Sequence, residues 1–560
     1  MNGAEALVES LKKEGVEVIF GISGGAALPI YDALETHGKA INNILVRHEQ
    51  CAAHMAEGYA RVSGKVGVCL ATSGPGATNL VTGIADAVLD SIPIVAITGQ
   101  VPTGAIGTDA FQESDIMGIT MPIVKHSLQA RNADDIPRLV KEAFYIASTG
   151  RPGPVLLDIP RDISQAELTE YKHPDEANIR GYKPHHEINM TDVAAAAKLI
   201  DEAKKPVLYI GGGLSNVSAD AEVLALAEKA DLPVTTTLMA RGCFPERHPL
   251  CLSMLGMHGT AYANWAVRDT DLLIAIGARF DDRVTAKLET FATNAKVIHV
   301  EVDPAEVHKN RLADVAILAD AKEALIALHG AVKSQKRDDW RRQIGEWKEQ
   351  QPLNYDRAGD SLKPQYVMEQ LAELTDGKDI LSTDVGQHQM WAAQYYPFTR
   401  SRQWLTSGGL GTMGYGLPAA IGAKVAKPDE DVWLVTGDGS FQMSLQELAT
   451  SMVYKIPVKI ILLNNGVLGM VRQWQTMFYE ERYSGSILTA VPNFQLIAEA
   501  YGCVGITVKE AKDVRPALEK AKEIKDRTVL IDFQHDPNEH IYPMIPSGTS
   551  VDEMKLQPEN

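Results

Sequence analysis

Two short polar motifs in the last third of the chain have the residue types of a metal–diphosphate site. Asp438 lies in the glycine-flanked stretch 437–440 (GDGS), and Asn465 closes the pair Asn464-Asn465 further on. A carboxylate and an amide oxygen suit Mg²⁺, which recruits phosphate oxygens, and the glycines leave room for backbone amides to approach a diphosphate. Either motif alone is typical of a surface turn or a strand cap. Together, at the two ends of one structural unit, they favour a magnesium–diphosphate site.

The segments around these motifs predict a strand–helix–strand unit. Apolar runs at 432–436 and 458–463 have the composition of buried strands, and the segment between them has apolar residues at helical spacing. Ser444 and Glu447 have the spacing of a helix-capping box. Because such a unit is a right-handed crossover between parallel strands, both candidate ligands should lie at the carboxyl edge of one sheet, where α/β proteins bind ligands.

A second candidate for chemistry is Glu49, which follows the apolar run 43–46 and precedes an alanine-rich helical segment at 51–64. A carboxylate at such a strand end, in an apolar setting, is suited to proton transfer. The alternative is a helix N-terminal glutamate that only complements the helix dipole.

Strands and helices alternate along the chain, which predicts an α/β protein with three doubly wound parallel-sheet domains. The domains are expected at 1–165, 190–330 and 363–545. The polar segment 166–190 is expected to be a linker, and the charged segment 330–360 an exposed helix and linker. The strands expected in the domains are 16–20, 43–46, 66–71, 93–98, 155–160, 207–210, 232–237, 272–276, 297–303, 379–384, 433–438, 458–463 and 529–533. A site could form where the first domain meets the third.

The composition excludes several classes of function. With 54 basic and 72 acidic residues in 560, the net charge is −18, which argues against a nucleic acid or an anionic membrane as partner. The five cysteines are scattered and lack metal-ligand spacing, so we expect a reducing, cytoplasmic location. No apolar run is long enough to cross a membrane, and the N-terminal segment has the pattern of a helix and a strand rather than of a signal peptide.

Longer motifs resemble those of the thiamine-diphosphate enzymes and, more narrowly, of the acetohydroxyacid synthase (acetolactate synthase) catalytic subunits. The resemblance covers about residues 4–545, and its longest motifs have eight to twelve residues. The motifs that carry it are 47–50 (RHEQ), 54–61 (HMAEGYAR), 72–79 (TSGPGATN), 99–102 (GQVP), 106–113 (IGTDAFQE), 150–154 (GRPGP), 386–391 (GQHQMW), 406–417 (TSGGLGTMGYGL) and 469–475 (GMVRQWQ).

The resemblance implies an enzyme that decarboxylates pyruvate on thiamine diphosphate and joins the two-carbon unit to a second pyruvate or to 2-ketobutyrate. This is the first common step of valine, leucine and isoleucine biosynthesis. The cofactors implied are thiamine diphosphate, Mg²⁺ and a structural FAD, because the net reaction is not redox chemistry. The resemblance also implies a homodimer or a dimer of dimers, in which Glu49 of one subunit faces Asp438 of another, and it allows a separate small regulatory subunit.

For the catalytic centre, the resemblance implies Glu49, Gln112 and Gly25. Glu49 would stabilise protonation at N1′ of the cofactor's pyrimidine ring, and Gln112 and Gly25 would position the keto acids. Ser23 stands where the family commonly has proline, which bears on the stiffness of the loop that holds Gly25.

For the cofactor, the resemblance implies that Asp438, Asn465 and the backbone carbonyl of Val467 hold Mg²⁺. Met413 would be an apolar prop that bends the thiamine, and Gly411 would offer its backbone to the pyrimidine. Without the resemblance, Met413 would be taken for an ordinary core methionine. The thiamine diphosphate contacts implied are Glu49, Thr72, Pro75, Asn79, Val385, Gly386, Gln387, His388, Gly411, Met413, Gly437, Asp438, Gly439, Ser440, Asn465, Val467, Leu468, Gly469 and Met470.

The middle domain is the expected flavin site, since arginines suit the FAD diphosphate and acidic residues suit the ribose hydroxyls. The FAD contacts implied by the resemblance are Arg151, Gly211, Gly212, Gly213, Leu238, His258, Gly259, Gly277, Ala278, Arg279, Asp281, Arg283, Glu301, Val302 and Asp320. The stretch 409–414 also fits the dinucleotide pattern G-x-G-x-x-G. Only a short apolar segment precedes it, so it is a weak candidate for a nicotinamide site.

The substrate pocket is expected to include Phe111, Gln112, Met470 and Trp474. Trp474 lies on a segment expected to cover the site, and by resemblance this position also contacts inhibitors. The alternative for this tryptophan is packing between two helices.

Other functions remain alternatives. A thiamine-dependent pyruvate oxidase, in which the flavin turns over, and a simple keto-acid decarboxylase are relatives, but the segments 279–284 (RFDDRV) and 469–475 favour the synthase. A flavin or nicotinamide oxidoreductase without thiamine is a different class. A non-catalytic nucleotide-binding scaffold would leave Glu49 and Gln112 unexplained.

Overall fold

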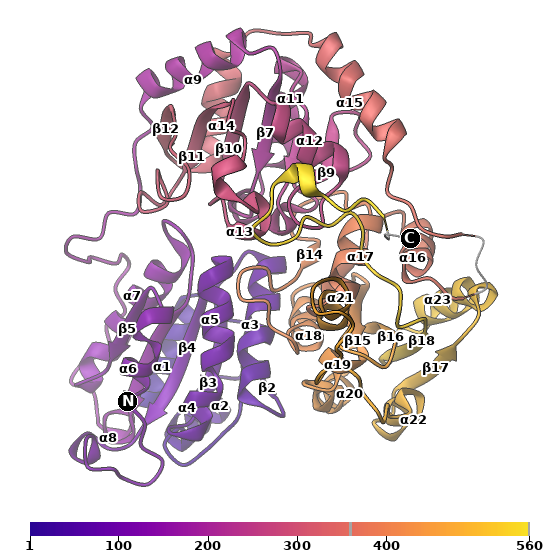
Figure 1. The fold of residues 1–560 in the computed structure, drawn as a ribbon. Coiled ribbons are helices and arrows are strands. Elements are labelled where there is room, and N and C mark those ends of the chain that lie inside the picture. Colours follow the sequence, from indigo (N-terminus) through magenta and orange to yellow (C-terminus); the bar gives the residue numbers. More distant parts are fainter. Residues whose placement is uncertain (358–360, 558–560) are drawn as a thin grey trace.

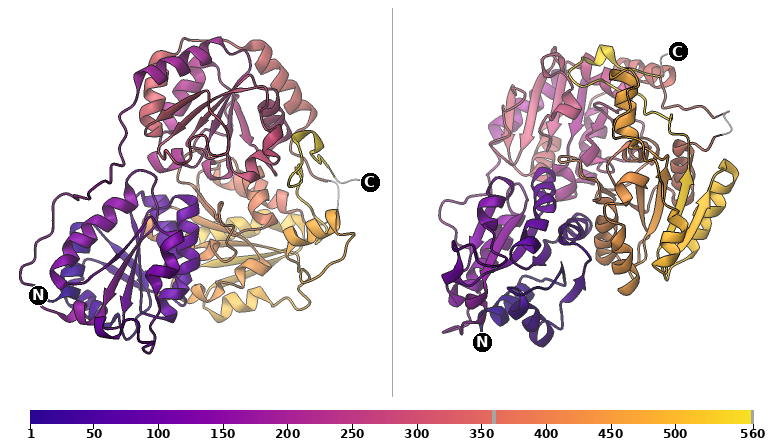
Figure 2. Two further views of the ribbon diagram at one scale, coloured as in Figure 1. Left: turned by 60° about the vertical axis from the view of Figure 1, so that its left-hand side comes forward. Right: turned by 60° about the horizontal axis from the view of Figure 1, so that its bottom comes forward.

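Three α/β domains meet at a common centre in the computed structural model, which describes residues 1–357 and 361–557 (Figure 1). Each domain has one six-stranded sheet, and neighbouring strands in all three are parallel. In the view of Figure 1 the middle domain lies above the other two, and a long connection from the first domain to the middle one runs along the outside of the molecule (Figure 2).

The elements of the first domain are β1 Val18–Gly21, β2 Asn42–Leu45, β3 Gly67–Ala71, β4 Ile94–Gln100, β5 His126–Gln129 and β6 Val155–Pro160, with α1 Gly3–Lys13, α2 Leu28–His37, α3 Glu49–Ser63, α4 Pro75–Asn79, α5 Val81–Asp90, α6 Ile116–Thr120, α7 Ile136–Ser148 and α8 Arg161–Gln165. Those of the middle domain are β7 Pro206–Ile210, β8 Val234–Thr236, β9 Cys251–Met254, β10 Leu272–Ile276, β11 Lys296–Glu301 and β12 Val315–Leu318, with α9 Met190–Glu202, α10 Gly213–Val217, α11 Asp220–Ala230, α12 Ala261–Asp269, α13 Asp282–Thr285, α14 Ala321–Ala331 and α15 Asp338–Gln350. Those of the third domain are β13 Ile380–Thr383, β14 Trp404–Leu405, β15 Val432–Gly437, β16 Lys459–Asn464, β17 Val504–Val508 and β18 Val529–Gln534, with α16 Pro364–Thr375, α17 Gln387–Tyr395, α18 Gly416–Ala426, α19 Asp438–Phe441, α20 Leu448–Val453, α21 Gly469–Phe478, α22 Phe494–Ala500 and α23 Val514–Glu523.

The predicted fold class is confirmed, and so are the strands expected from apolar runs. The sheet orders are β2-β1-β3-β4-β6-β5, β12-β11-β10-β7-β8-β9 and β14-β13-β15-β16-β18-β17. The strands that the sequence did not predict, β5, β9, β12, β14 and β17, all lie at sheet edges. An edge strand is covered less completely, as the partly exposed β5 and β17 show, so it does not need a continuous apolar run. Residues 358–360 of the predicted second linker lie outside the described residues.

The predicted capping box at Ser444 and Glu447 is wrong. The chain from 438 to 453 forms two short helices with a 3-10 turn between them, and the Ser444 side chain makes no capping hydrogen bond. Glu447 instead accepts the backbone N–H groups of Arg47 and His48 in the first domain, at 2.9 and 3.1 Å. Contact between domains overrides the local pattern here.

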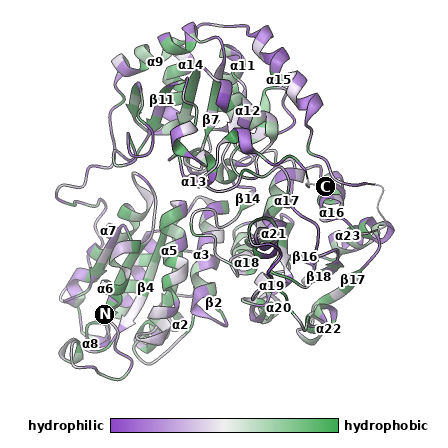
Figure 3. Cartoon of the chain, in the orientation of Figure 1, coloured by the Kyte–Doolittle hydropathy of each residue, from purple (hydrophilic) through white to green (hydrophobic). Residues whose placement is uncertain are grey.

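Helices α3 and α18 join the first and third domains through a close crossing of small residues. A Cβ added at Gly58 in α3 would lie 2.7 Å from the Ala419 Cα, and one at Gly422 in α18 would lie 2.8 Å from the Met55 carbonyl carbon. One apolar core runs through this crossing, from strands of the first sheet to strands of the third. Figure 3 shows the apolar residues gathered on the sheets and on the inner sides of the helices. The start of α3, where Glu49 lies, is therefore fixed by the contact with the third domain.

Within residues 1–357 and 361–557, no helix combines the length and the apolar character needed to cross a bilayer.

The close crossing of α3 and α18 predicts that a larger side chain at Gly58 strongly destabilises the fold. Gly58→Val should lower the free energy of unfolding by about 3 kcal/mol, because the added methyl groups overpack against the Ala419 backbone. Gly345→Ala, in α15, is the matched control: a Cβ there meets nothing within 4 Å, so helix propensity alone should raise stability by about 0.5–1 kcal/mol. Thermal unfolding followed by circular dichroism measures both. A Gly58→Val protein that melts with the wild type would contradict the close packing.

Candidate active site

The first group of candidate residues surrounds Glu49, the first residue of α3. His48 caps this helix, because its imidazole Nδ1 accepts the Gln50 N–H at 3.2 Å. The Glu49 carboxylate is 9% exposed and accepts a hydrogen bond from Asn79 Nδ2 at 2.9 Å. Gly76 in α4 leaves room for the carboxylate, since a Cβ there would lie 3.3 Å from Glu49 Oε1.

The neighbouring loops contribute the other first-domain candidates for the catalytic centre and the thiamine site, which are Gly25, Thr72, Pro75 and Gln112. The Thr72 hydroxyl oxygen accepts the Ala26 N–H at 3.2 Å, which fixes the turn after β1. At Gly74 the backbone has φ 61°, and a Cβ would lie 2.7 Å from the Gln112 carbonyl oxygen, so this turn requires glycine. The structure therefore brings Glu49, Asn79 and the turns that hold the other candidates to one edge of the first sheet.

Asp438 follows β15 at the carboxyl edge of the third sheet, and Asn465 follows β16, as the crossover prediction required. The Asp438 residue is 1% exposed, and burial raises the pKa of its carboxyl to about 6. The backbone N–H groups of Asp438 itself, Asn465 and Gly466 lie near the carboxylate and lower its pKa, though by less than burial raises it. Its Oδ2 atom has no partner among the described residues.

The residues at this position fit a magnesium ion. A buried carboxylate oxygen without a partner is costly unless a ligand satisfies it. The Asn465 side-chain oxygen accepts the Val467 N–H at 3.2 Å, so Asn465 and Val467 form one turn beside Asp438. A carboxylate, an amide oxygen and a backbone carbonyl make the all-oxygen donor set that Mg²⁺ prefers.

Glycines bring the backbone close to two side chains of α17. A Cβ at Gly386 or Gly437 would lie within 2.9 Å of the His388 imidazole, and one at Gly469 would collide with the Gln387 amide. Burial lowers the pKa of His388 to about 3, so the imidazole is neutral at pH 7. The result is a cradle of backbone amides and neutral side chains, suited to a diphosphate.

Met413 and Leu468 lie over the other side of this cradle. A Cβ at Gly439 would lie 2.5 Å from the Leu468 side chain and 3.8 Å from Met413 Cε. The Ser440 hydroxyl donates to the Val385 carbonyl oxygen at 3.3 Å, which ties the turn after β15 to the turn after β13. Met413 is thus close to the residues predicted to bind the diphosphate.

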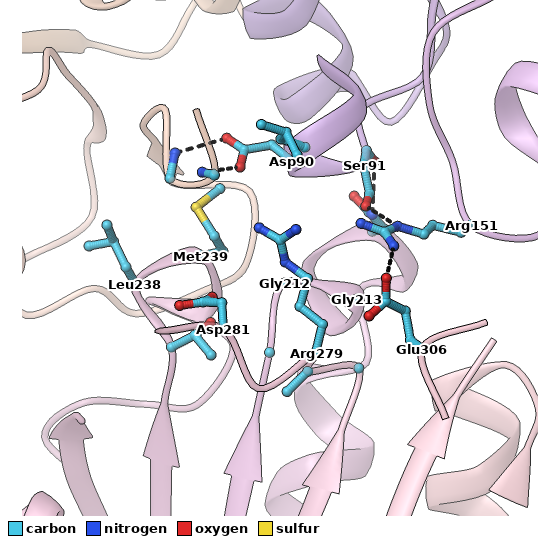
Figure 4. A pocket seen from close by; sticks show the side chains of 18 of the residues that line it. Asp90, Ser91, Arg151, Gly212, Gly213, Leu238, Met239, Arg279, Asp281 and Glu306 are labelled. Carbon is cyan, nitrogen blue, oxygen red and sulfur yellow. Dashed lines mark hydrogen bonds and ion pairs between the residues drawn. The ribbon is translucent and has the colours of Figure 1, made fainter. Parts of the chain in front are cut away.

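A cavity of about 1040 Å³ opens where the three domains meet (Figure 4). All the residues expected to contact FAD line it except Gly259, whose N–H closes a turn onto the Gly256 carbonyl at 2.9 Å. The third domain contributes residues expected at the thiamine or substrate site, namely Val385, Gly411, Met470 and Trp474. The cavity therefore shares a wall with the Asp438 site.

Arginines reach the cavity from two domains. Arg151 of the first domain donates from Nε to Ser91 Oγ at 2.8 Å and from Nη1 to Glu306 Oε1 at 2.9 Å (Figure 4). Arg279, which follows β10, extends toward Asp90 of the first domain (Figure 4). Both guanidinium groups are placed to meet an anionic ligand.

The strand ends below these arginines are closely packed glycines and helix caps. The Gly213 N–H donates to the Gly277 carbonyl at 3.1 Å, and a Cβ at Gly213 would lie 2.9 Å from the Gly277 Cα. Asp281 and Asp320 cap α13 and α14, and Glu301 accepts backbone N–H groups just after its own strand. These acidic residues are thus fixed at the cavity edge by local backbone contacts.

Sequence reasoning missed several lining residues. They are Leu89, Asp90, Ser91, Asn216, Met239, Glu306, Ser407, Gly408 and Gly409, among others. Of these, Ser407, Gly408 and Gly409 had a signal, because they lie inside the motif 406–417. The stretch 409–414 was the weak candidate for a nicotinamide site. Its first glycine already has a partner, because the Gly409 N–H donates to Asp90 Oδ1 at 2.7 Å.

Two expected neighbours are not brought together within one chain. Phe111 is 89% exposed and does not line the cavity that Trp474 lines. Trp474 packs edge-on against Phe478, with ring centroids 6.2 Å apart, and the Arg283 guanidinium lies 6.0 Å from its ring centroid. Across the described parts of the chain, no hydrogen bond or ion pair links the Glu49 group to the Asp438 group.

Comparison with protein-family models matches the three domains in order. Residues 1–119 match the thiamine pyrophosphate enzyme N-terminal TPP binding domain, residues 193–328 the central domain, and residues 384–533 the C-terminal TPP binding domain.

Comparison with curated proteins finds relatives along nearly the whole chain. The acetolactate synthase large subunit of Corynebacterium glutamicum is 52% identical in an alignment of 562 positions that covers 98% of this chain and 89% of the relative. The acetolactate synthase of Mycobacterium bovis is 52% identical, covering 99% of this chain and 91% of the relative. The acetolactate synthase large subunit of Haemophilus influenzae is 47% identical, covering 99% and 98%. The chain therefore belongs to the thiamine pyrophosphate enzymes and, within them, to the acetolactate synthase family.

Proposed function

We propose that this chain is the catalytic subunit of an acetolactate synthase. It would decarboxylate pyruvate and join the two-carbon unit to a second pyruvate or to 2-ketobutyrate. The observation that carries the proposal is identity near 50% with acetolactate synthases along nearly the full chain, combined with a buried, unsatisfied Asp438 at the predicted metal position.

The third domain would hold the diphosphate end of the cofactor. Asp438, Asn465 and the Val467 carbonyl would bind Mg²⁺, and the glycine cradle around His388 would receive the diphosphate oxygens. Thiamine diphosphate, once bound, supplies the carbon nucleophile and accepts the electrons released with CO₂. The protein's part is to orient the cofactor and keep water out, and Met413 and Leu468 would form the apolar wall that does so.

The first domain would supply the proton chemistry from a second copy of the chain. Glu49 would hold a proton shared with N1′ of the pyrimidine, and Asn79 fixes the orientation of its carboxylate. Because Glu49 and Asp438 are not in contact within one chain, a homodimer would be the smallest active unit. Exposed apolar side chains on the first and third domains support such an association, among them Leu45, Phe111, Met443, Val471 and Ile487.

The central cavity would hold FAD as a structural cofactor, since joining two keto acids with loss of CO₂ transfers no net electrons. Arg151 and Arg279 would face the diphosphate, and Glu301 and Asp320 the ribose hydroxyls. A volume of about 1040 Å³ supports a ligand of this size. The large-subunit names of the relatives support a separate small regulatory subunit, and a cytoplasmic location stays a prediction.

A product assay tests the activity directly. Purified protein with pyruvate, thiamine diphosphate, Mg²⁺ and FAD under air should form acetolactate, detected as acetoin only after acid treatment, with little peroxide or acetaldehyde. Omitting thiamine diphosphate should abolish the product. Peroxide together with acetate would instead identify an oxidase, and acetaldehyde alone a simple decarboxylase.

Removing the Asp438 carboxylate should abolish the response to Mg²⁺. Asp438→Asn is expected to lower activity at least about 100-fold, because it deletes the only anionic Mg²⁺ ligand that the protein is proposed to supply. Asp429→Asn, an exposed carboxylate on the loop before β15, is the matched control. Equal Mg²⁺ activation of Asp438→Asn and wild type would refute the metal assignment.

The stabilisation by Mg²⁺ should depend on pH. The folded pKa of Asp438, about 6, lies above the unfolded value, so the apoprotein is favoured by protonation and loses stability as pH rises toward and through 6. Mg²⁺ binds the ionised form. The rise in Tm on adding Mg²⁺ and thiamine diphosphate should therefore be full above about pH 7 and disappear as pH falls through 6. An increment that is flat from pH 5 to 8 would argue against Asp438 as the ligand.

Glu49→Gln should lower kcat by about 10²- to 10⁴-fold while cofactor affinity and Tm stay near the wild type. Glu35→Gln, exposed on α2, is the control. Co-expression of Glu49→Gln with Asp438→Asn chains should restore activity, because a mixed dimer holds one site with both groups intact. Mixed dimers as inactive as their parents would place both residues in one chain's site.

A further inference from the structure

The loop 407–412, called here the glycine loop, lines the central cavity and lies beside Val385, whose carbonyl accepts the Ser440 hydroxyl from the turn after β15. Four of its residues, Ser407, Gly408, Gly409 and Gly411, line the cavity. Gly411 also lies beside Val385, since a Cβ there would be 3.9 Å from Val385 Cγ1. Whatever fixes this loop therefore acts on both ligand sites.

Two aspartates of α5, one turn apart, hold the glycine loop from the first domain. Asp90 accepts the backbone N–H groups of Gly408 and Gly409 at 3.0 and 2.7 Å. Asp86 Oδ1 accepts the Ser407 hydroxyl and, at 3.1 Å, the Thr412 hydroxyl. Both ends of the loop are thus bound to one helix of another domain, more than 300 residues away in sequence.

The position of Asp90 is electrostatically unfavourable within its own domain. Asp90 is the last residue of α5, where the helix dipole disfavours a negative charge, and its side chain is only 1% exposed. Arg61 offsets the charge through a contact of 2.6 Å. Apart from Arg61, the hydrogen-bond partners of Asp90 belong to the glycine loop. The arrangement serves the loop rather than the helix.

A second buried carboxyl group lies beside Asp86. Burial, and next the proximity of Asp86, raise the pKa of Glu57 well above its ordinary value. In its protonated form, the Glu57 carboxyl can donate to Asp86 beside the hydroxyls of Ser407 and Thr412. His54, which contacts Glu57 at 2.9 Å, is neutral because burial lowers its pKa to about 4.

The glycine loop is closely packed on the side that faces the cavity. A Cβ at Gly408 would collide with Met239, and one at Gly409 would lie 2.8 Å from Leu89 Cβ and 3.0 Å from Arg279 Nη2. Both Met239 and Arg279 line the cavity. Because packed contacts of this kind transmit displacement rather than absorb it, a ligand that orders Met239 and Arg279 also orders the loop.

We propose that Asp86 and Asp90 are positioning residues that hold the glycine loop so that flavin in the central cavity and thiamine diphosphate at the Asp438 site raise each other's affinity. The inference rests on the proposed function and adds a role for a flavin that takes no part in the chemistry. Since such coupling is reciprocal, either cofactor can report it.

The test is a flavin-fluorescence titration of the full-length protein with FAD in the presence of Mg²⁺, with and without saturating thiamine diphosphate. In the wild type, thiamine diphosphate should lower the FAD Kd about 5-fold or more. In Asp90→Asn the ratio should fall toward one, because asparagine cannot accept both N–H groups or pair with Arg61. Asp271→Asn is the matched control: Asp271 likewise accepts two successive backbone N–H groups, of Lys204 and Lys205, but does not line the cavity.

Ser407→Ala gives a second, milder variant if Asp90→Asn does not fold, and it should also reduce the ratio. Loss of coupling in Asp271→Asn as well would mean a general effect on stability and would overturn the assignment, as would a wild-type ratio of one or unchanged ratios in both Asp90→Asn and Ser407→Ala. A wild-type protein that binds both cofactors without coupling would refute this inference but not the proposed function. Failure to bind thiamine diphosphate at all would instead refute the proposed function.

Discussion

The contact on which the other features of this molecule depend is the crossing of α3 and α18, where Gly58 and Gly422 let two helices from different domains pack backbone to backbone. Only residues without bulk permit this distance, and a shared apolar core then makes the first and third domains one body. The crossing fixes the start of α3, and with it Glu49. Through α18 it also constrains the end of the glycine loop, which lies just before that helix in the chain.

Around this rigid contact the chain keeps polar groups that do not favour folding. Asp438 is buried with an unsatisfied oxygen, and the His388 imidazole is buried with Nε2 unpartnered among the described residues. Such groups cost free energy in the isolated chain and are recovered only when a ligand binds them. Two such groups in neighbouring turns at the carboxyl edge of one sheet support a binding site there, independent of any family resemblance.

The sequence was informative wherever the structure is set by local patterns. Apolar runs predicted the central strands, and the crossover rule placed Asp438 and Asn465 at one sheet edge before any contact was known. The sequence was not informative where the conformation of one segment depends on contacts with a distant segment. Glu447 has the spacing of a local cap, yet its Oε1 atom accepts backbone N–H groups of the first domain, about 400 residues away, and only Oε2 has a local partner, the Thr450 hydroxyl. Asp90 likewise has no local pattern that distinguishes it from any helix-terminal aspartate.

The central cavity explains why three similar domains form one enzyme rather than a string of units. Its walls come from all three, with Arg151 from the first, Arg279 from the second and Gly408 and Gly409 from the third. A ligand in this cavity binds only when the three domains are assembled, so its binding stabilises the contacts between the domains. A flavin that takes no part in redox chemistry would thus still have a structural role. It would fill the cavity, order the residues that pack against the glycine loop, and through that loop keep the thiamine diphosphate site in place.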